Sequence, residues 1–315
     1  MKSARASAAA SVSNLGPGYD VLGLCLDGPR DEVEVSLNMS GRLRIIQIEG
    51  DGGRLPWDAT QNCATVAAQA VMARFGEPQM GLDLRLKKGL PLGSGLGSSA
   101  ASAVAAAVAT AALIAPDTPR IDLLNACREG ERLATGSPHP DNVAPSLLGG
   151  LVACVPREGE AVDIVPLVVP DGLTVVTVKP NISVSTAEAR AALPRQVAMA
   201  DAVSNVAEMA ALVTGLATGD YNLVGRSLGD RFATPYRKGF IAGYDEVVAA
   251  AVEAGAIGAG ISGSGPTLFA LCSHPSSAEA VVASMVAGFA AHGLESVAHV
   301  SGVDSVGARV EVVTG

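Results

Sequence analysis

Three glycines at alternate positions, followed by two serines, form the part of the chain best suited to chemistry. The stretch reads Pro91-Leu92-Gly93-Ser94-Gly95-Leu96-Gly97-Ser98-Ser99-Ala100-Ala101-Ser102. Glycine lets the backbone turn tightly and approach a ligand with no Cβ atom in the way. Ser98 and Ser99 open a long Ala-rich helix, where serine is a favourable N-cap and the first turn carries unpaired N–H groups. With the helix dipole, these groups predict a site for a polyphosphate anion.

The same stretch has a plainer interpretation as a flexible turn that caps a buried helix. It is not a Walker A loop, because no Lys follows Gly97, and its third glycine comes one place too early for a dinucleotide fingerprint. A second run, Gly258, Gly260 and Gly263, does match GxGxxG. There a helix is expected before the glycines and a strand after them, which reverses the required order. We therefore predict a tight turn over residues 258–265 that approaches the substrate or the first loop.

The elements that must position these residues follow from hydrophobic periodicity. Strand-like alternation marks residues 31–37, 43–48, 82–87, 149–155, 173–178, 267–272 and 308–313. Helical spacing marks residues 62–75, 98–115, 121–134, 186–193, 198–214, 245–254 and 277–292. Strands and helices mix without regular βαβ alternation, so the pattern favours α+β layers over a doubly wound sheet. A domain boundary is predicted near Val165.

Composition limits the class of protein. The chain has 315 residues, of which 49% are hydrophobic and only 3% aromatic, so small aliphatic side chains must fill the core. A net charge of −9 argues against nucleic acid as a partner, because a nucleic-acid polymer needs a broad basic surface. A single nucleotide needs only a few amides, a metal and some cations, so it stays compatible with this charge.

The cysteines and the apolar segments indicate a cytoplasmic protein. The cysteines are odd in number, scattered, and form no CxxC pair, so we interpret them as reduced thiols rather than zinc ligands. Residues 98–115 are the only candidate for a membrane helix, but they are mostly Ala and are predicted to be a buried helix instead. Residues 1–12 lack the apolar run of a signal peptide. The five cysteines are Cys25, Cys63, Cys127, Cys154 and Cys272.

The first loop has the form Pro-x-Gly-x-Gly-Leu-Gly-Ser-Ser-Ala, which resembles the ATP loop of the GHMP kinases, enzymes that phosphorylate small molecules. Further stretches, in the family's order, resemble its homoserine kinase branch. Two departures are the absence of the usual Ala-Pro near residues 7–10 and the presence of Tyr19 where Phe is usual. The matching stretches are Ser13-Asn14-Leu15-Gly16-Pro17-Gly18-Tyr19-Asp20, Pro140-Asp141-Asn142-Val143-Ala144-Pro145, Asn181-Ile182-Ser183-Val184-Ser185-Thr186-Ala187-Glu188-Ala189-Arg190 and Ser262-Gly263-Ser264-Gly265-Pro266.

The resemblance implies a two-domain α+β GHMP kinase fold. Residues 1–165 would form an ATP-binding domain like ribosomal protein S5 domain 2, and residues 166–315 a ferredoxin-like α/β sandwich. It implies ATP and Mg²⁺ as cofactors, with Ser99 and Glu131 as metal ligands. On its own, Glu131 would be an ordinary solvated helix charge. The implied nucleotide-binding residues are Pro91, Gly93, Ser94, Gly95, Leu96, Gly97, Ser98, Ser99 and, near the adenine, Asn62.

The second substrate implied by the resemblance is L-homoserine, a zwitterion that carries a hydroxyl group. Asn14 and Asp20 would bind its ammonium group. Arg190 and Arg237 would bind its carboxylate, since a guanidinium matches a carboxylate bidentately. Taken alone, each arginine is typical of a surface charge, and Asp20 after Gly-Pro-Gly is typical of a turn.

The substrate hydroxyl would lie near Asp141 and Asn142, and two mechanisms stay open. Asp141 could accept the hydroxyl proton as a general base. Alternatively, Asn142 holds the hydroxyl while the metal and cations stabilise the transition state, and we favour this second mechanism. His139 lies between two prolines and is interpreted as structural, and Lys87 and Lys88 as the solvated end of a strand.

Two other functions compete with this interpretation. One is a different GHMP kinase, of mevalonate or shikimate type, whose substrate lacks an ammonium group. The other is a non-catalytic module that binds nucleotides. The expected partners are L-homoserine and ATP, with no nucleic acid and no membrane, and the resemblance suggests a homodimer.

Overall fold

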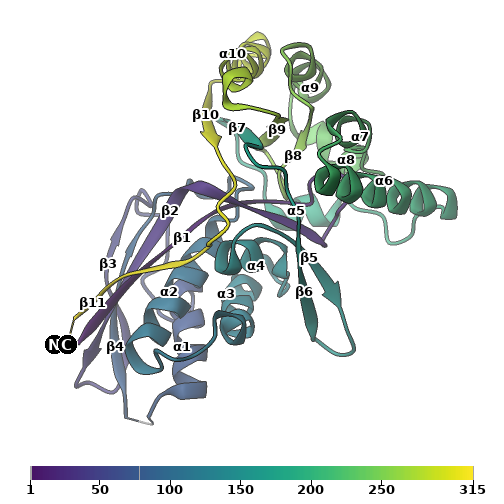
Figure 1. Ribbon diagram of the computed structural model, residues 1–315. Helices are drawn as coiled ribbons and strands as arrows, with labels where there is room; N and C mark the ends of the chain where they lie inside the picture. The colour runs from purple at the N-terminus through teal and green to yellow at the C-terminus, as the bar shows by residue number, and fades with distance from the viewer. Residues whose placement is uncertain (1, 78, 315) are drawn as a thin grey trace.

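A computed structural model describes residues 2–77 and 79–314, which form two β-sheets with helices packed against them (Figure 1). The larger sheet follows the order β11-β1-β2-β4-β3, with β5 paired to β2 and β6 to β5. Only β3 and β4 pair in parallel among its described neighbours. Its strands are β1 (Ser3–Ser13), β2 (Leu22–Asn38), β3 (Leu43–Glu49), β4 (Gly81–Lys87), β5 (Leu151–Pro156), β6 (Val162–Leu167) and β11 (Arg309–Thr314).

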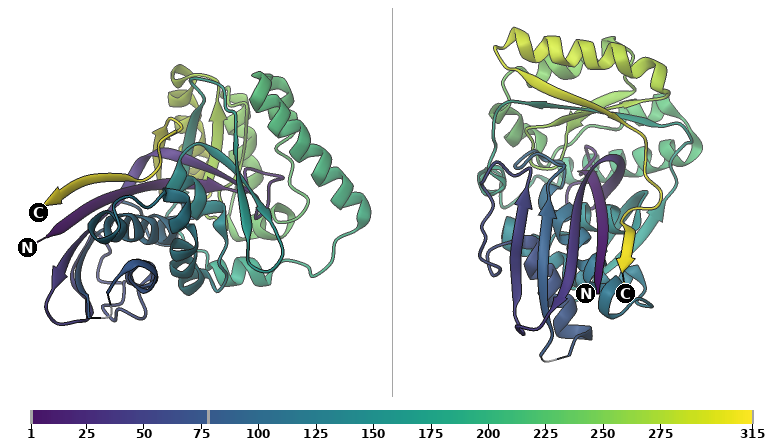
Figure 2. Two further views of the ribbon diagram at one scale, coloured as in Figure 1. Left: turned by 60° about the horizontal axis from the view of Figure 1, so that its bottom comes forward. Right: turned by 90° about the vertical axis from the view of Figure 1, so that its left-hand side faces the viewer.

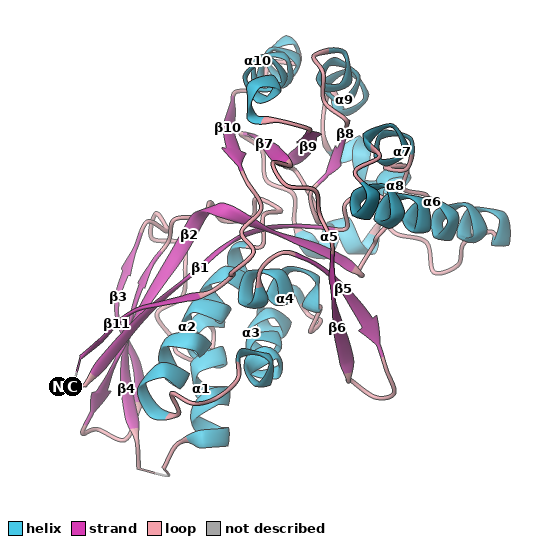
Figure 3. Ribbon diagram, viewed as in Figure 1, coloured by secondary structure: helices cyan, strands magenta, loops and turns pink. Residues whose placement is uncertain are grey.

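Four helices cover one face of this sheet, below it in Figure 3. They are α1 (Cys63–Phe75), α2 (Ser98–Ile114), α3 (Leu124–Thr135) and α4 (Pro140–Leu148). A short 3₁₀ turn, η1 (Arg120–Leu123), precedes α3, so the α-helix begins three residues later than the pattern predicts. Helix α4 was not predicted, because Pro145 inside it breaks the helical signal.

The smaller sheet is antiparallel and has the order β10-β7-β9-β8. Helices α9 (Tyr244–Glu253) and α10 (Pro275–Ala291) pack on one of its faces, as the right-hand view of Figure 2 shows for α10. The strands are β7 (Thr174–Pro180), β8 (Gly258–Ile261), β9 (Leu268–Cys272) and β10 (Ser296–Ser301); the connecting helices are α5 (Thr186–Ala191), α6 (Met199–Thr218), α7 (Tyr221–Arg226), α8 (Thr234–Arg237) and the 3₁₀ turn η2 (Lys238–Phe240).

The two sheets do not divide the chain at one point. Strand β6 crosses residue 165 within the larger sheet, and β11 returns from the far end of the chain to pair with β1. Ser3 consequently lies opposite Thr314, so the two ends of the described chain are side by side in Figure 1. Asp304 secures this return, because its buried carboxylate bonds Arg30 and Arg309, each at 2.9 Å. The division into domains of residues 1–165 and 166–315 stays a prediction. The larger sheet includes β6, which spans residue 165, and β11 from the end of the chain, so the two sheets do not separate at that boundary.

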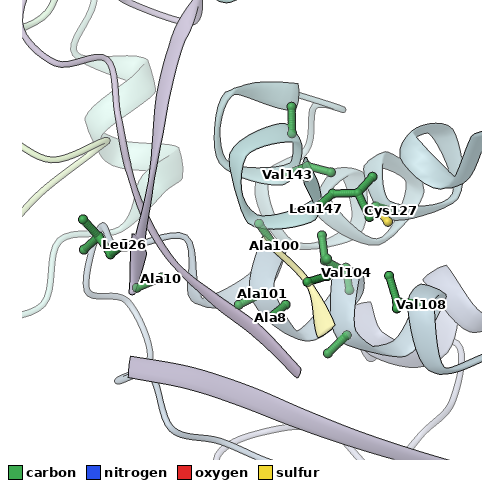
Figure 4. Close-up of a cluster of buried hydrophobic side chains, with 14 of the residues drawn as sticks. Ala8, Ala10, Leu26, Ala100, Ala101, Val104, Val108, Cys127, Val143 and Leu147 are labelled. Atoms are coloured by element: carbon green, nitrogen blue, oxygen red, sulfur yellow. The ribbon is translucent and has the colours of Figure 1, made fainter. Parts of the chain in front are cut away.

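The Ala-rich helix is buried on nearly all sides, as its composition predicts. Residues of β1 such as Ala8 and Ala10 face Ala100, Ala101 and Val104 of α2 (Figure 4). Small side chains allow helix and sheet to approach closely, so the core reaches high density with few aromatic residues. In the described part of the chain, no helix is both long and apolar enough to cross a membrane.

The second glycine run is partly a strand rather than a turn. Residues 258–261 form β8, paired with β9, and only residues 262–266 make the turn. The prediction of a turn over the whole of 258–265 is therefore wrong for its first half. Leu228 packs against Gly258 and Phe269 packs against Gly260. A Cβ atom added to these glycines would lie 2.5 Å from Leu228 and 3.2 Å from Phe269, respectively, so there is little room for a side chain.

Gly130→Ala should destabilise the helical layer. Gly130 lies on α3, where it faces α1 and α2. A Cβ atom at position 130 would lie 2.5 Å from the Cys63 carbonyl oxygen and 2.8 Å from the Ala103 Cβ, so α3 would have to move away from α1 and α2. We expect a loss of about 1–3 kcal/mol in the free energy of unfolding, measured by urea denaturation. Gly239→Ala is the control, since nothing lies within 4 Å of its added Cβ. Equal stabilities of the two variants would contradict this packing.

Candidate active site

The first glycine loop ends in a helix N-terminus that no side chain caps. Gly97 occupies the N-cap position of α2 with φ of 67°, and no described side chain bonds the first-turn amides. The expectation that serine caps this helix is wrong, since the Ser98 hydroxyl donates to the Leu90 carbonyl at 3.5 Å. The amides of the first turn therefore stay available to a ligand, with the helix dipole behind them.

The second glycine turn holds the loop in place. Gly95 has φ of 79°, and an added Cβ would lie 2.6 and 2.7 Å from the carbonyl oxygens of Ser262 and Gly265. The Ser262 hydroxyl donates to the Gly95 carbonyl at 2.7 Å, and the Thr267 amide donates to the Ser94 carbonyl at 3.3 Å. The predicted contact between the two glycine segments is thus present.

Beneath the loop lies a buried ion pair that the sequence interpretation missed. Lys88 is 7% exposed, and its ammonium donates to the Asp31 carboxylate, to the Ser98 carbonyl at 2.9 Å and to the Ser102 hydroxyl at 2.8 Å. The interpretation of Lys88 as a solvated strand end is wrong, although Lys87 is exposed and pairs with Glu32. The other Asp31 oxygen accepts the amides of residues 89 and 90, so the pair fixes the start of the loop.

Ser99 and Glu131 meet in the folded chain, as expected. The Ser99 hydroxyl donates to a Glu131 carboxylate oxygen at 2.6 Å, and Glu131 is 5% exposed. Burial raises the pKa of Glu131 to about 7, and the charge of Asp141 adds to this shift. A buried carboxylate with no described cation against it, beside a hydroxyl and a phosphate-type loop, is a donor set that suits Mg²⁺.

Asn142 lies between the N-terminal strand and the loop. Its Oδ1 accepts a hydrogen bond from the Ser11 hydroxyl at 2.9 Å, and its Nδ2 donates to the Ser13 hydroxyl at 3.0 Å. A Cβ at Gly97 would come within 2.9 Å of Asn142 Oδ1, so the absence of a side chain at 97 makes room for this amide. Asp141 is 4% exposed, and burial raises its pKa to about 7, followed in effect by the charge of Asp20.

At the other end, Asp20 is the centre of a polar cluster. The Arg190 guanidinium forms two bonds to its carboxylate, at 3.2 and 3.3 Å, and His139 Nδ1 lies 3.6 Å away. The backbone of Asn14 is left-handed, with φ of 72°. Its side-chain Oδ1 accepts a hydrogen bond from the Asp20 amide at 3.1 Å, and its Nδ2 donates to the Gly263 carbonyl. Asn14 therefore orients the Asp20 backbone.

Arg237 is buried next to this cluster. It donates to the carbonyls of Ala189 at 3.1 Å and Gly263 at 3.0 Å, and its guanidinium lies 5.3 Å from the centre of the Tyr19 ring. Within the described residues, Arg190 Nε and His139 Nε2 are buried with no hydrogen-bond partner. Desolvation lowers the pKa of His139, which favours its neutral form. These groups leave unpaired polar atoms where a polar ligand would fit.

One cavity of about 360 Å³ joins the two ends, and this size suits a small-molecule site. Most of the predicted residues line it, but Pro91 and Leu96 lie on the opposite side of the loop. Asn62 lines the cavity while its amide caps α1 and donates to the Pro56 carbonyl. Residues that the prediction missed also line it, namely Ser13, Leu55, Pro56, Gln61, Cys63, Lys88, Leu92, Ser102, Leu133, Ala134, Thr135, Thr186 and Ser264.

Comparison with known proteins agrees with the fold. The GHMP kinases N terminal domain matches residues 62–150, and the GHMP kinases C terminal domain matches residues 211–291. A homoserine kinase of Chlorobium phaeobacteroides is 41% identical, covering 98% of this chain and all of that protein. One of Arabidopsis thaliana is also 41% identical, covering 98% of this chain and 84% of that protein.

Solved structures give the same result. The crystal structure of homoserine kinase from Cytophaga hutchinsonii superposes with a TM-score of 0.94 at 41% identity, over 99% of this chain and 98% of that one. Mevalonate kinase from L. major shares the fold, with a TM-score of 0.68 at 18% identity over 90% of each chain. The chain therefore belongs to the GHMP kinase family. Within that family it belongs to the homoserine kinases.

Asp141→Asn should change how the stability of the ligand-free protein depends on pH. Because the folded-state pKa of Asp141 is raised to about 7, folded protein keeps a proton that unfolded chains lose near pH 4. The stability of the wild type therefore falls as pH rises from about 4 to about 7, and the asparagine variant lacks this part of the loss.

Urea denaturation at about pH 5 and about pH 8 measures the effect, and the variant should gain about 1–4 kcal/mol relative to wild type between the two conditions. Asp171→Asn is the matched control, since that carboxylate is exposed. The same pH dependence in wild type and Asp141→Asn would show that the carboxylate is ionised in the fold.

Proposed function

We propose that this chain transfers the terminal phosphoryl group of ATP to the side-chain hydroxyl of L-homoserine, forming O-phospho-L-homoserine for threonine biosynthesis. The observation that carries the proposal is the single cavity that joins an uncapped helix N-terminus to the Asp20–Arg190 cluster. The names of the relatives suggest the substrate, and the charges and donors that line the cavity support the assignment.

The phosphate end of the cavity is built for a polyanion. The amides of the first turn of α2 would face the phosphates, and the left-handed Gly93, Gly95 and Gly97 would let the backbone approach them. Ser99 and Glu131 would hold Mg²⁺, which when bound neutralises phosphate charge and orients the transferred group. Phosphoryl transfer asks the protein mainly for such positioning and charge stabilisation.

The other end suits a zwitterion. Asp20 has the charge to bind the ammonium group, and Arg190 and Arg237 have donors for the carboxylate. The Asp20–Arg190 pair is only partly buried, with side chains 26% and 36% exposed, so both partners can reach a ligand. A mevalonate- or shikimate-type substrate lacks the ammonium group, so it would offer the Asp20 carboxylate no positive charge to bind.

The hydroxyl would lie between these ends, beside Asn142. Two serines fix both polar atoms of the Asn142 amide, which makes it a rigid positioning group. Asp141 has a pKa of about 7, which also suits a general base. Because the transition state of phosphoryl transfer is loose and needs little base catalysis, we favour positioning by Asn142.

A cytoplasmic location and a homodimer complete the proposal. The free cysteines are consistent with a reducing compartment. Light scattering of the purified chain tests the dimer, and a monomer at the working concentration would contradict it.

Ser99→Ala and Glu131→Gln should each reduce kcat by about 10²-fold or more, because each removes an oxygen proposed to hold Mg²⁺. The measurement is ADP release that depends on both ATP and L-homoserine, run beside mevalonate and shikimate. Ser273→Ala, at an exposed serine outside the lining of the reaction cavity, is the control for folding. Nucleotide binding without phosphoryl transfer to any of these compounds by the wild type would favour a non-catalytic module.

Asn142→Ala and Asp141→Asn distinguish the two mechanisms. We expect Asn142→Ala to reduce kcat by about 10²-fold, and Asp141→Asn to keep kcat within about tenfold of wild type. The profile of kcat against pH gives an independent test, since a base with a pKa near 7 would make kcat fall below that pH. Loss of activity in Asp141→Asn at every pH would assign proton abstraction to Asp141.

A further inference from the structure

A second cavity lies on the opposite side of the phosphate loop, between the two sheets. Its volume is about 560 Å³. Lys88 lines both cavities, so the loop and this residue separate them. Nothing in the proposed reaction uses this space. Its lining consists of Gly50, Lys88, Gly89, Leu90, Pro91, Leu96, Thr177, Lys179, Asn181, Glu295, Ser296, Val297 and His299.

One wall is the back of the phosphate loop. Leu90 and Leu96 are almost fully buried, and the Leu96 carbonyl accepts the Ser11 amide at 3.1 Å. The Leu90 carbonyl also accepts a hydrogen bond from the Ser98 hydroxyl. A ligand in this cavity would therefore touch the same segment whose front faces the triphosphate.

The other wall is one face of strands β7 and β10. Side chains two residues apart on a strand lie on the same face, which places Thr177 and Lys179 together. On β10 the residues opposite them are His299 and Val297. Glu295 precedes β10 and is exposed at the rim. This wall presents hydroxyl, ammonium and imidazole groups to the cavity.

One hydroxyl group of this wall is buried and unpaired. Thr177 is 1% exposed, and its Oγ1 has no hydrogen-bond partner among residues 2–77 and 79–314. An unpaired buried polar group costs about 1–3 kcal/mol, so this hydroxyl gains if a polar ligand enters.

The half-buried Lys179 brings positive charge to this wall of the cavity. The Lys179 ammonium donates to the carbonyls of Pro180 at 3.2 Å and Ile182 at 3.5 Å, and no carboxylate of the described residues lies within salt-bridge distance. Burial and the nearby Arg54 lower the pKa of Lys179. Lys88 adds no free charge, because Asp31 neutralises it. An anion would remove the penalty of the uncompensated ammonium.

We propose that this cavity binds a compact oxyanion, a phosphate or carboxylate group, through Lys179 and Thr177. The bound oxyanion contacts Leu90, Pro91 and Leu96 and restrains the phosphate loop from behind. The site is separate from the reaction cavity, so its ligand acts on the loop rather than competing for the phosphate seat.

Calorimetric titration of the full chain tests the site, with Mg²⁺, a non-hydrolysable ATP analogue and L-homoserine at saturation so that both ends of the reaction cavity are occupied. Inorganic phosphate and acetate are the probes, and we expect saturable binding of at least one. Phosphate binding alone would assign a phosphate ligand, and acetate binding alone a carboxylate ligand. Lys179→Met should weaken binding by about tenfold or more, because it removes a charge-assisted bond. Lys2→Met, at an exposed lysine outside the cavity lining, is the matched control.

Thr177→Val keeps the shape of the side chain and should weaken binding about threefold to tenfold. Hydrogen exchange gives the second readout: the probe should slow exchange of amides 89–97 in wild type and leave it unchanged in Lys179→Met. No saturable binding of either probe, or equal binding by wild type and Lys179→Met, would overturn the proposal. Binding that leaves exchange of the loop unchanged would overturn its second part.

Discussion

The uncapped N-terminus of α2 is the interaction on which the rest of the structure depends. Its first amides can face a phosphate only because Gly97 adopts a left-handed conformation and supplies no side chain. The buried Asp31–Lys88 pair holds the loop from below, and the turn at residues 262–266 holds it from the second sheet. Contacts from both sheets thus hold the glycine-rich loop in one conformation.

Burial of charge follows from the same requirement. Glu131 and Asp141 are buried away from water, which raises the pKa of each to about 7, so the ligand-free fold carries an electrostatic cost at neutral pH. Divalent metal and substrate would offset that cost when they bind. Binding energy is then available for the groups that react, which is typical of sites that are preorganised for charge.

The sequence predicts the loop, its helix and the convergence of most site residues, because each depends on local pattern or on a recognisable motif. It does not predict the burial of Lys88, since a lysine at a strand end is ordinarily solvated and its partner, Asp31, lies 57 positions away along the chain. Helix α4 escapes prediction because Pro145 interrupts its pattern. The sequence also does not predict which loop residues face the reaction cavity, because tertiary packing decides this. Pro91 and Leu96 line the second cavity instead.

A structure of the chain with Mg²⁺ and a non-hydrolysable ATP analogue tests the central claim most directly. The account predicts triphosphate oxygens within hydrogen-bond distance of the amides at the start of α2, with the metal beside Ser99 and Glu131. Phosphates bound in any other part of the molecule, with those amides facing water, would contradict it.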